Sequence, residues 1–245
     1  MKVKMGGFME NTSKDFQAFH IAIAGAICTI AGTFFSGPLA FIAVSSIQPQ
    51  PEWSGAQVYV AHYHPVQSLT FYFGLILLFG SVLMITSIYF LNRKSIKSLL
   101  ALIFTAIACG LISFNYFIQA ALIPALIRNY TPALDPVVTL FAVANPSSLF
   151  WAIEMWGYGF LGLGTLFAGG FFSGRGLEKA TRILFLTNGY ASLAGALYTS
   201  IRLEWVLSKA GLATYVGWNI LYLFLVFFFL IVILRRRVKL LRLST

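Results

Sequence analysis

A single carboxylate lies inside a stretch of chain that is otherwise apolar enough to cross a bilayer. Residues 145–172 read NPSSLFWAIEMWGYGFLGLGTLFAGGFF, and Glu154 lies about two helical turns from their start. An ionisable group at that depth is costly in hydrocarbon, so its side chain should face protein or a wet cavity. Glu154 is therefore our first candidate for a binding site, or for acid/base chemistry inside the membrane.

Polar residues also recur at helical spacing in the neighbouring apolar segments. Along residues 181–207 they step by 4, 3, 4 and 3, which places them on one face of a helix. This stripe consists of Asn188, Ser192, Gly195, Thr199 and Arg202. Other segments carry polar pairs three or four residues apart, namely Asn115 and Gln119, Glu154 and Tyr158, and Asn219 and Tyr222. We expect these faces to converge in the outer half of the bilayer.

We expect Glu154 to pair with Arg202, because either ion left alone in hydrocarbon would cost several kcal/mol. The predicted ligand-binding set around this pair is Glu154, Arg202, Asn115, Gln119, Tyr158, Thr199, Asn219 and Tyr222. The same groups are compatible with two other roles. They could cross-link the helices without any ligand, or Glu154 could serve as the acid/base of an intramembrane enzyme.

The sequence gives little support for metal or cofactor chemistry. His62 and His64 form an H-x-H pair, but no third His or Cys lies nearby to complete a zinc or copper site. We interpret the pair as part of a polar outer rim and predict no metal. The chain also lacks the Walker, HExxH and GxSxG patterns, and its apolar segments contain no lysine that could hold retinal. We therefore predict no cofactor.

Composition identifies the class of protein. The chain is 59% hydrophobic and 10% charged, whereas soluble domains carry about a quarter charged residues. A net charge of +10 in a soluble protein would suggest nucleic acid, but here the basic residues lie in short loops and tails between apolar segments. There they fix orientation and attract anionic lipid head groups at the cytoplasmic face. We expect the lipid bilayer, and not nucleic acid, as the partner.

Six apolar segments reach the roughly 20 residues that a spanning helix needs. They are residues 19–46, 66–91, 99–127, 149–172, 181–207 and 212–234. We therefore expect one all-α polytopic domain over residues 1–245, built as a bundle of six transmembrane helices. Of the 17 Lys and Arg residues, 14 fall in the tails and loops on one side of these segments and 2 on the other. The positive-inside rule then places both termini in the cytoplasm.

Local features predict where the helices bend, end and pack closely. Pro38 and Pro124 should kink their helices or end them early, and the basic run at residues 235–237 should close the sixth segment. The fourth segment has glycines that should allow close helix packing, at Gly157, Gly159, Gly162 and Gly164.

Two runs of sequence resemble a family of uncharacterised bacterial multi-pass membrane proteins, a domain-of-unknown-function family. One is Asn145–Pro146 followed by Phe150–Trp151–Ala152–Ile153–Glu154 and Gly157–Tyr158, and the other is Asn115–Tyr116–Phe117–Ile118–Gln119. The likeness covers the third and fourth segments. It implies a bacterial inner-membrane protein and brings no activity with it.

The function that these patterns favour is the binding of a small or amphipathic molecule in an outward-facing polar pocket, as a carrier, sensor or accessory subunit. A transporter should show a path that continues past Asn188 to the cytoplasm, whereas a structural protein should show no cavity at all.

Overall fold

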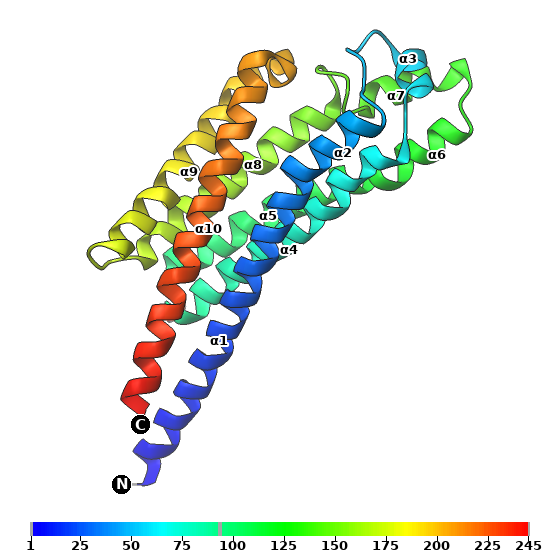
Figure 1. Ribbon diagram of the computed structural model, residues 1–245. Helices are drawn as coiled ribbons and strands as arrows, with labels where there is room; N and C mark the ends of the chain where they lie inside the picture. Colours follow the sequence, from blue (N-terminus) through cyan, green and yellow to red (C-terminus); the bar gives the residue numbers. More distant parts are fainter. Residues whose placement is uncertain (1, 93–94, 245) are drawn as a thin grey trace.

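The computed structural model describes residues 2–92 and 95–244, and every element within those ranges is a helix (Figure 1). Six long segments run alternately up and down. They are α1–η1–α2 (Lys2–Phe34, Phe35–Leu39, Ala40–Ile47), η2–α4 (Pro65–Ser68, Leu69–Leu91), α5–η3–α6 (Ile96–Phe117, Ile118–Leu122, Ile123–Arg128), α8–η5 (Leu149–Ala168, Gly169–Phe171), α9 (Leu177–Ile201) and α10 (Lys209–Ser244). The two termini lie at the same end of the bundle, which we call the lower end as in Figure 1.

Short helices cover the upper end. They are α3 (Ala56–Ala61), η4 (Pro132–Leu134), α7 (Asp135–Phe141) and η6 (Leu203–Leu207). The buried side chains of α3, α6 and α7 form a small apolar cluster of their own, which includes Tyr59, Ile123 and Val138. The segments between the long helices at this end are therefore folded against one another.

Four of the long segments are apolar and long enough to cross a membrane, as expected of a membrane protein. They are Lys14–Ile47, Pro65–Leu91, Ile96–Arg128 and Lys209–Arg242. The helices α8 and α9 fall outside this group because Glu154, the polar stripe and several glycines lower their mean hydropathy. Both are nevertheless long, at 20 and 25 residues.

The six long segments close into a ring. Each packs against the next along the chain, from α1 to α4, α5, α8, α9 and α10, and α10 packs back against α1. Glycines bring α8 close to both of its neighbours. A Cβ atom at Gly157 or Gly164 would collide with α5, and one at Gly159 or Gly162 would collide with α9. The predicted role of these glycines in close packing is therefore confirmed.

The lower half of the ring is filled with side chains. Phe172, Phe185 and Phe229 form a cluster in which every pair of rings is in contact, with centroids 4.9 to 6.4 Å apart. All three are almost fully buried. Met84, Ile85 and Ile88 on α4 complete this core with no exposure to solvent. The cavity next to Glu154 lies above this core.

The structure refines several local predictions. Of the two outcomes predicted at Pro38, a kink or an early end, the early end does not occur, because Pro38 lies in the π-helical turn η1 and the chain continues as α2. The wider turn tolerates the missing N–H of proline. The basic run at residues 235–237 ends the apolar stretch but not the helix, and α10 continues to Ser244. The fifth helix ends at Ile201, six residues before its predicted end, and a 3-10 turn follows.

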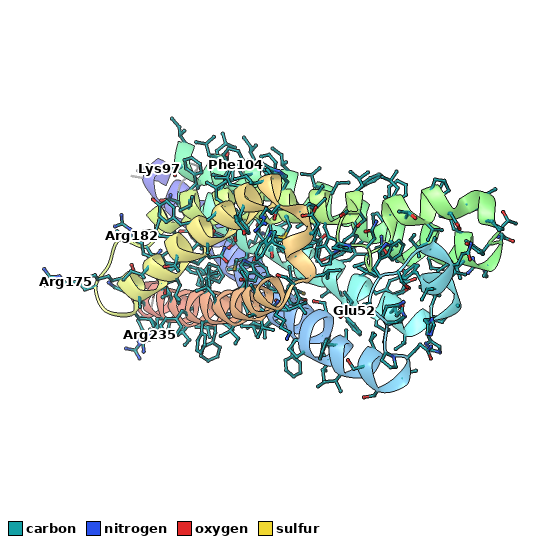
Figure 2. All side chains as sticks on the ribbon, turned by 90° about the horizontal axis from the view of Figure 1, so that it is seen from above. Glu52, Lys97, Phe104, Arg175, Arg182 and Arg235 are labelled. Carbon is teal, nitrogen blue, oxygen red and sulfur yellow. The ribbon has the colours of Figure 1, made fainter. Side chains whose placement is uncertain are left out.

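Charge is distributed unevenly along the bundle. Lys97, Arg175, Arg182 and Arg235 all lie at one end, and Glu52 lies at the other (Figure 2). Between the ends, the outer surface is apolar, with large exposed side chains that include Phe41, Phe79, Tyr190 and Ile201. Such a surface suits contact with lipid.

Candidate functional site

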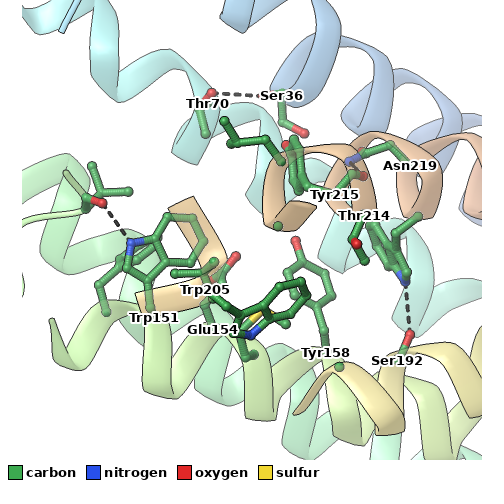
Figure 3. Close-up of a pocket in the computed structure, with 18 of the residues that line it drawn as sticks. Ser36, Thr70, Trp151, Glu154, Tyr158, Ser192, Trp205, Thr214, Tyr215 and Asn219 are labelled. Carbon is green, nitrogen blue, oxygen red and sulfur yellow. Dashed lines mark hydrogen bonds between the residues drawn. The ribbon is translucent and has the colours of Figure 1, made fainter. Parts of the chain in front are cut away.

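A cavity of about 210 Å³ opens in the upper half of the ring (Figure 3). Its walls come from the first turns of α8 and α10 and the last turns of α9, with η1, α4, α5 and η6 completing them. Most of the lining side chains are apolar or aromatic, and the remainder are hydroxyls, one amide and one carboxylate. The walls of this cavity are mostly apolar, whereas the sequence predicted a polar pocket.

The carboxylate is that of Glu154, which is only 4% exposed. Asn115 donates an amide N–H to its Oε2 at 2.9 Å, and Tyr116 donates its O–H to Oε1 at 2.9 Å. Both donors have further partners, because Asn115 also donates to the Phe150 carbonyl and the Tyr116 hydroxyl contacts that of Tyr158 at 3.1 Å. The side chain is thus fixed by two neutral donors on α5.

The predicted pair between Glu154 and Arg202 is not formed in the part of the chain that the structure describes. Arg202 is exposed and follows the last residue of α9, so its guanidinium is outside the cavity. The early end of α9 is the physical reason, because it moves residue 202 from a helix face in the membrane to the surface of the bundle. With α5 supplying neutral donors, no protein cation is needed to hold the carboxylate in place.

Three tryptophans of the cavity wall have their N–H groups bonded to protein acceptors. Trp151 donates to the Val143 carbonyl at 2.8 Å, Trp205 to Thr199 Oγ1 at 2.8 Å, and Trp218 to Ser192 Oγ at 2.9 Å. Trp218 also packs between the rings of Tyr158 and Tyr222, with centroids 4.6 and 4.9 Å away. These bonds and stacks fix the indoles in the wall of the cavity.

The predicted stripe of α9 faces the interior only from Asn188 to Thr199, and of its residues Asn188 and Thr199 do not line the cavity. Asn188, Ser192 and Thr199 are buried, and Ser192 and Gly195 line the cavity. The opposite face is exposed, to 66% at Tyr190 and 80% at Ile201. The stripe also bonds to its neighbours rather than standing free, since Asn188 donates to Thr165 Oγ1 on α8 at 3.1 Å.

The remaining predicted site residues have different positions. Asn219 lines the cavity, and its amide donates to the Tyr215 carbonyl. Tyr222 is fully buried beneath Trp218, and its hydroxyl contacts Ser81 Oγ at 2.8 Å. Gln119 lies apart from the cavity, because its Nε2 donates to the Phe141 carbonyl of α7 at 2.6 Å. The structure therefore brings together Glu154, Asn115, Tyr158 and Asn219, and it separates Gln119 and Arg202 from them.

Four aromatic residues of the site were not predicted from the sequence, namely Tyr116, Trp151, Trp205 and Trp218. Tyr116 follows Asn115 directly and could have been found as a buried phenol that needs a partner in a membrane helix. Trp205 had no such signal, because it was placed inside the fifth helix, whereas it belongs to η6.

The histidines of the upper end have individual partners. Nδ1 of His62 lies 2.9 Å from the Val58 carbonyl, and Nδ1 of His64 accepts the Val66 N–H at 3.1 Å. Within the described residues, no group of three or more His, Cys, Asp or Glu side chains is arranged to hold a metal ion.

Outside the apolar segments, the phenol of Tyr130 donates to Asp135, and this bond raises the pKa of Tyr130 to about 12.

Chemically, the site presents one buried carboxylate and several aromatic rings to a small enclosed volume. Such a site can hold an apolar body by burial and orient it by one charged group. No protein-family model matches the chain, and no curated protein or solved structure matches it either.

Proposed function

We propose that this protein crosses the inner membrane of a bacterium six times, with both termini in the cytoplasm, and binds a small or amphipathic molecule in the cavity. The gathering of basic residues at the lower end supports this orientation, and it also supports contact with anionic lipid head groups there. The ring supports the count of six, because α8 and α9 close it and each is long enough to span about 30 Å of hydrocarbon.

One observation carries the binding proposal, namely a cavity of about 210 Å³ next to a buried carboxylate. Protein interiors pack densely, and voids larger than a water molecule are few. Cross-linking of helices would need the bonds of Glu154 but would leave no such space beside it. Drug-sized ligands occupy pockets of roughly 300–1,000 Å³, so this one suits a small molecule or the head of an amphiphile.

The closed lower half favours a sensor or an accessory subunit over a carrier. Asn188 has no exposure and is bonded to Thr165, and the cluster of Phe172, Phe185 and Phe229 fills the ring below. A molecule in the cavity has no route past these rings to the lower end. The proposed role is therefore to bind the molecule and report or retain it.

The test is native mass spectrometry of the protein released from a mild detergent. Gly195 lines the cavity, and an added Cβ would lie 3.5 Å from Met155 Cε, so Gly195→Leu fits locally and fills the space with its remaining atoms. We expect a bound mass on the wild-type protein and its loss from Gly195→Leu. The matched control is Gly217→Leu on the exposed side of α10, where a Cβ meets nothing within 4 Å, and it should retain the mass. Equal occupancy of both variants, or an empty wild-type protein, would contradict the proposal.

A further inference from the structure

We infer that the molecule bound in this cavity is an organic cation, a small amine or quaternary ammonium with an apolar body, whose charge lies against Glu154. This inference rests on the proposed function, because it names the chemistry of the ligand for the same cavity. Its two supports are the charge balance of the cavity and the nature of its walls.

The ionisable groups of the cavity are unbalanced. Among the described residues that line the cavity, Glu154 has the only carboxyl group, and no lysine, arginine or histidine accompanies it. Its two bonded partners, the Asn115 amide and the Tyr116 hydroxyl, are neutral. A carboxylate offers about four acceptor positions, so two bonds leave it able to accept more. A buried carboxylate in a membrane protein is normally accompanied by a cation, and a ligand is the group that can supply it here.

The walls are those that bind organic cations. Trp151, Trp205 and Trp218 line the cavity, together with the phenol rings of Tyr158 and Tyr215. Cations are attracted to the faces of aromatic rings, most strongly to tryptophan, and cages of such rings recognise quaternary ammonium groups. Because their indole N–H groups are bonded to protein acceptors, Trp151 and Trp205 offer ring surface and not polar donors, whereas the faces of Trp218 pack against Tyr158 and Tyr222. The apolar body of the ligand gains from the same walls by burial.

The alternatives fit the cavity less well. An anion would lie close to the Glu154 carboxylate with no lining cation to offset the repulsion, and Arg202 is exposed outside the cavity. A neutral apolar molecule would fill the volume but would remove water from the carboxylate without replacing it. A cation satisfies both the rings and the carboxylate.

Binding of matched probes tests the inference directly. Benzyltrimethylammonium and neopentylbenzene have the same skeleton, except that the first has a positive nitrogen where the second has a neutral carbon. Benzenesulfonate supplies a small aromatic anion. The wild-type protein in nanodiscs of phosphatidylglycerol is titrated with each probe, and tryptophan fluorescence is recorded against empty discs. We expect the cation to bind at least about tenfold more tightly than its neutral isostere, and the anion not to bind.

Two glutamine variants locate the charge that is responsible. Glu154→Gln should weaken binding of benzyltrimethylammonium about tenfold or more and leave neopentylbenzene unchanged. Glu204→Gln is the matched control, since Glu204 is an exposed glutamate near the same end and does not line the cavity. It should change neither affinity. If Glu154→Gln does not fold, the comparison of the three probes on the wild-type protein still decides.

A second arm of the same experiment identifies the source of the cation. Adding phosphatidylethanolamine to the discs offers a lipid whose head group carries an ammonium. Displacement of the bound probe by this lipid would show that the natural ligand is a lipid ammonium, whereas undisturbed binding would indicate a free amine. Both results agree with a cation bound next to Glu154.

The failure of this inference differs from the failure of the proposed function. Equal binding of the cation and the neutral isostere, or tighter binding of the anion, would overturn the cation and leave a ligand cavity in place. If no probe binds and no mass accompanies the purified protein, the proposed function itself is wrong.

Discussion

At the scale of single residues, the environment of Glu154 solves a problem that membrane proteins often solve with an ion pair. Neutral donors from Asn115 and Tyr116 hold one carboxylate oxygen each. Because neither donor carries a charge, the carboxylate keeps its attraction for a cation that enters the cavity. A neighbouring arginine would have cancelled that attraction. The residue is therefore held in position by hydrogen bonds from neutral groups.

The bond from Tyr116 should contribute measurably to stability. Tyr116→Phe removes the hydroxyl that donates to Glu154 Oε1 and leaves a buried carboxylate oxygen without that partner. Loss of such a partner costs about 1–3 kcal/mol, so the midpoint of thermal unfolding in detergent should fall by several degrees. Because the ring remains, its packing against Phe71 is preserved.

Two controls distinguish the loss of the hydrogen bond to Glu154 from the loss of a tyrosine hydroxyl in general. Tyr190→Phe makes the same chemical change on the 66% exposed face of α9 and should leave the midpoint almost unchanged. In a Glu154→Leu background the hydroxyl has no carboxylate to bond, so Tyr116→Phe should cost less there than in the wild type. An equal cost in both backgrounds would show that the bond to Glu154 contributes nothing.

At the scale of elements, glycines determine how closely the helices of the ring approach. The α1–α4 contact depends on Gly80, where an added Cβ would lie 2.5 Å from the backbone N of Thr29 and 2.7 Å from the Gly25 carbonyl oxygen. Backbone atoms cannot move aside as a flexible side chain can. We therefore expect Gly80→Ala to force the two helices apart and to destabilise the protein by about 1–3 kcal/mol.

A matched glycine on α5 tests whether crowding is the cause. Gly110 is exposed within its helix, and an added Cβ meets nothing within 4 Å. Gly110→Ala should leave stability unchanged or raise it by about 0.5–1 kcal/mol, because alanine loses less backbone freedom in a helix. Thermal unfolding of the two variants side by side measures the difference. A loss of stability at Gly110 equal to that at Gly80 would contradict the packing argument.

An ion pair connects the lower ends of α9 and α10. Glu178 bonds to Arg236, with Nε–Oε1 at 3.0 Å and Nη2–Oε2 at 2.9 Å, and the guanidinium lies 4.2 Å from the centroid of the Phe171 ring. Arg236 lowers the pKa of Glu178 below its ordinary value of 4.5, and the Gly174 N–H adds to this effect. The contact joins the α8–α9 turn to α10 at the basic end of the bundle.

The lowered pKa gives this contact a defined dependence on pH. A carboxylate whose folded pKa is depressed stabilises the fold at pH values above its unfolded pKa, and this stabilisation is lost as the pH falls through the folded pKa. At pH 7, Glu178→Gln should therefore lower stability by about 1 kcal/mol or less, since the pair is partly exposed. The difference from the wild type should shrink below pH 4.5. A difference that is constant from pH 7 to pH 3 would argue against the ion pair.

Residue spacing predicted the inward faces well because helical geometry alone determines them. The stripe from Asn188 to Thr199 needed nothing but the 4-3-4 steps, and it faces the interior as expected. The end of α9 could not be predicted in this way, because Leu203 and Val206 continue an apolar run although the backbone has left the helix. Because the helix was predicted to continue to residue 207, Arg202 was wrongly placed on its inward face. Partners such as Trp218 and Ser192 depend on how α9 and α10 are packed, which spacing within one helix does not encode.

At the scale of the whole molecule, the ring is closed by aromatic side chains in its lower half and hollow in its upper half. This asymmetry matches the asymmetry of charge, since the closed half is next to the basic end. With the basic end in the cytoplasm, the cavity belongs to the outer leaflet. The number of spans then decides whether Glu154 is within the membrane at all, because α8 and α9 are the two long segments that are not among the four candidate spans.

The turn between α8 and α9 distinguishes six spans from four. If only the four most apolar segments cross, residues 129–208 all lie on one side, so Arg175 is outside the cell and the C-terminus is inside. If all six cross, Arg175 and the C-terminus are both inside. A fusion at the C-terminus alone cannot separate the two cases, because both numbers are even. We therefore propose reporters inserted after Arg175, with the rest of the chain retained behind them.

We expect the cytoplasmic outcome at Arg175. The turn holds Arg175, and the start of α9 adds Lys179 and Arg182. Transfer of such a basic segment across the membrane is disfavoured. Alkaline phosphatase inserted there should be inactive and a green fluorescent reporter should glow, whereas the same reporters after Asn129, between α6 and η4, should give the reverse pattern. Reporters at the C-terminus should behave as at Arg175 and confirm that the chain has inserted. An active phosphatase at Arg175 would mean that α8 and α9 do not cross, and Glu154 would then lie outside the hydrocarbon that makes its partners necessary.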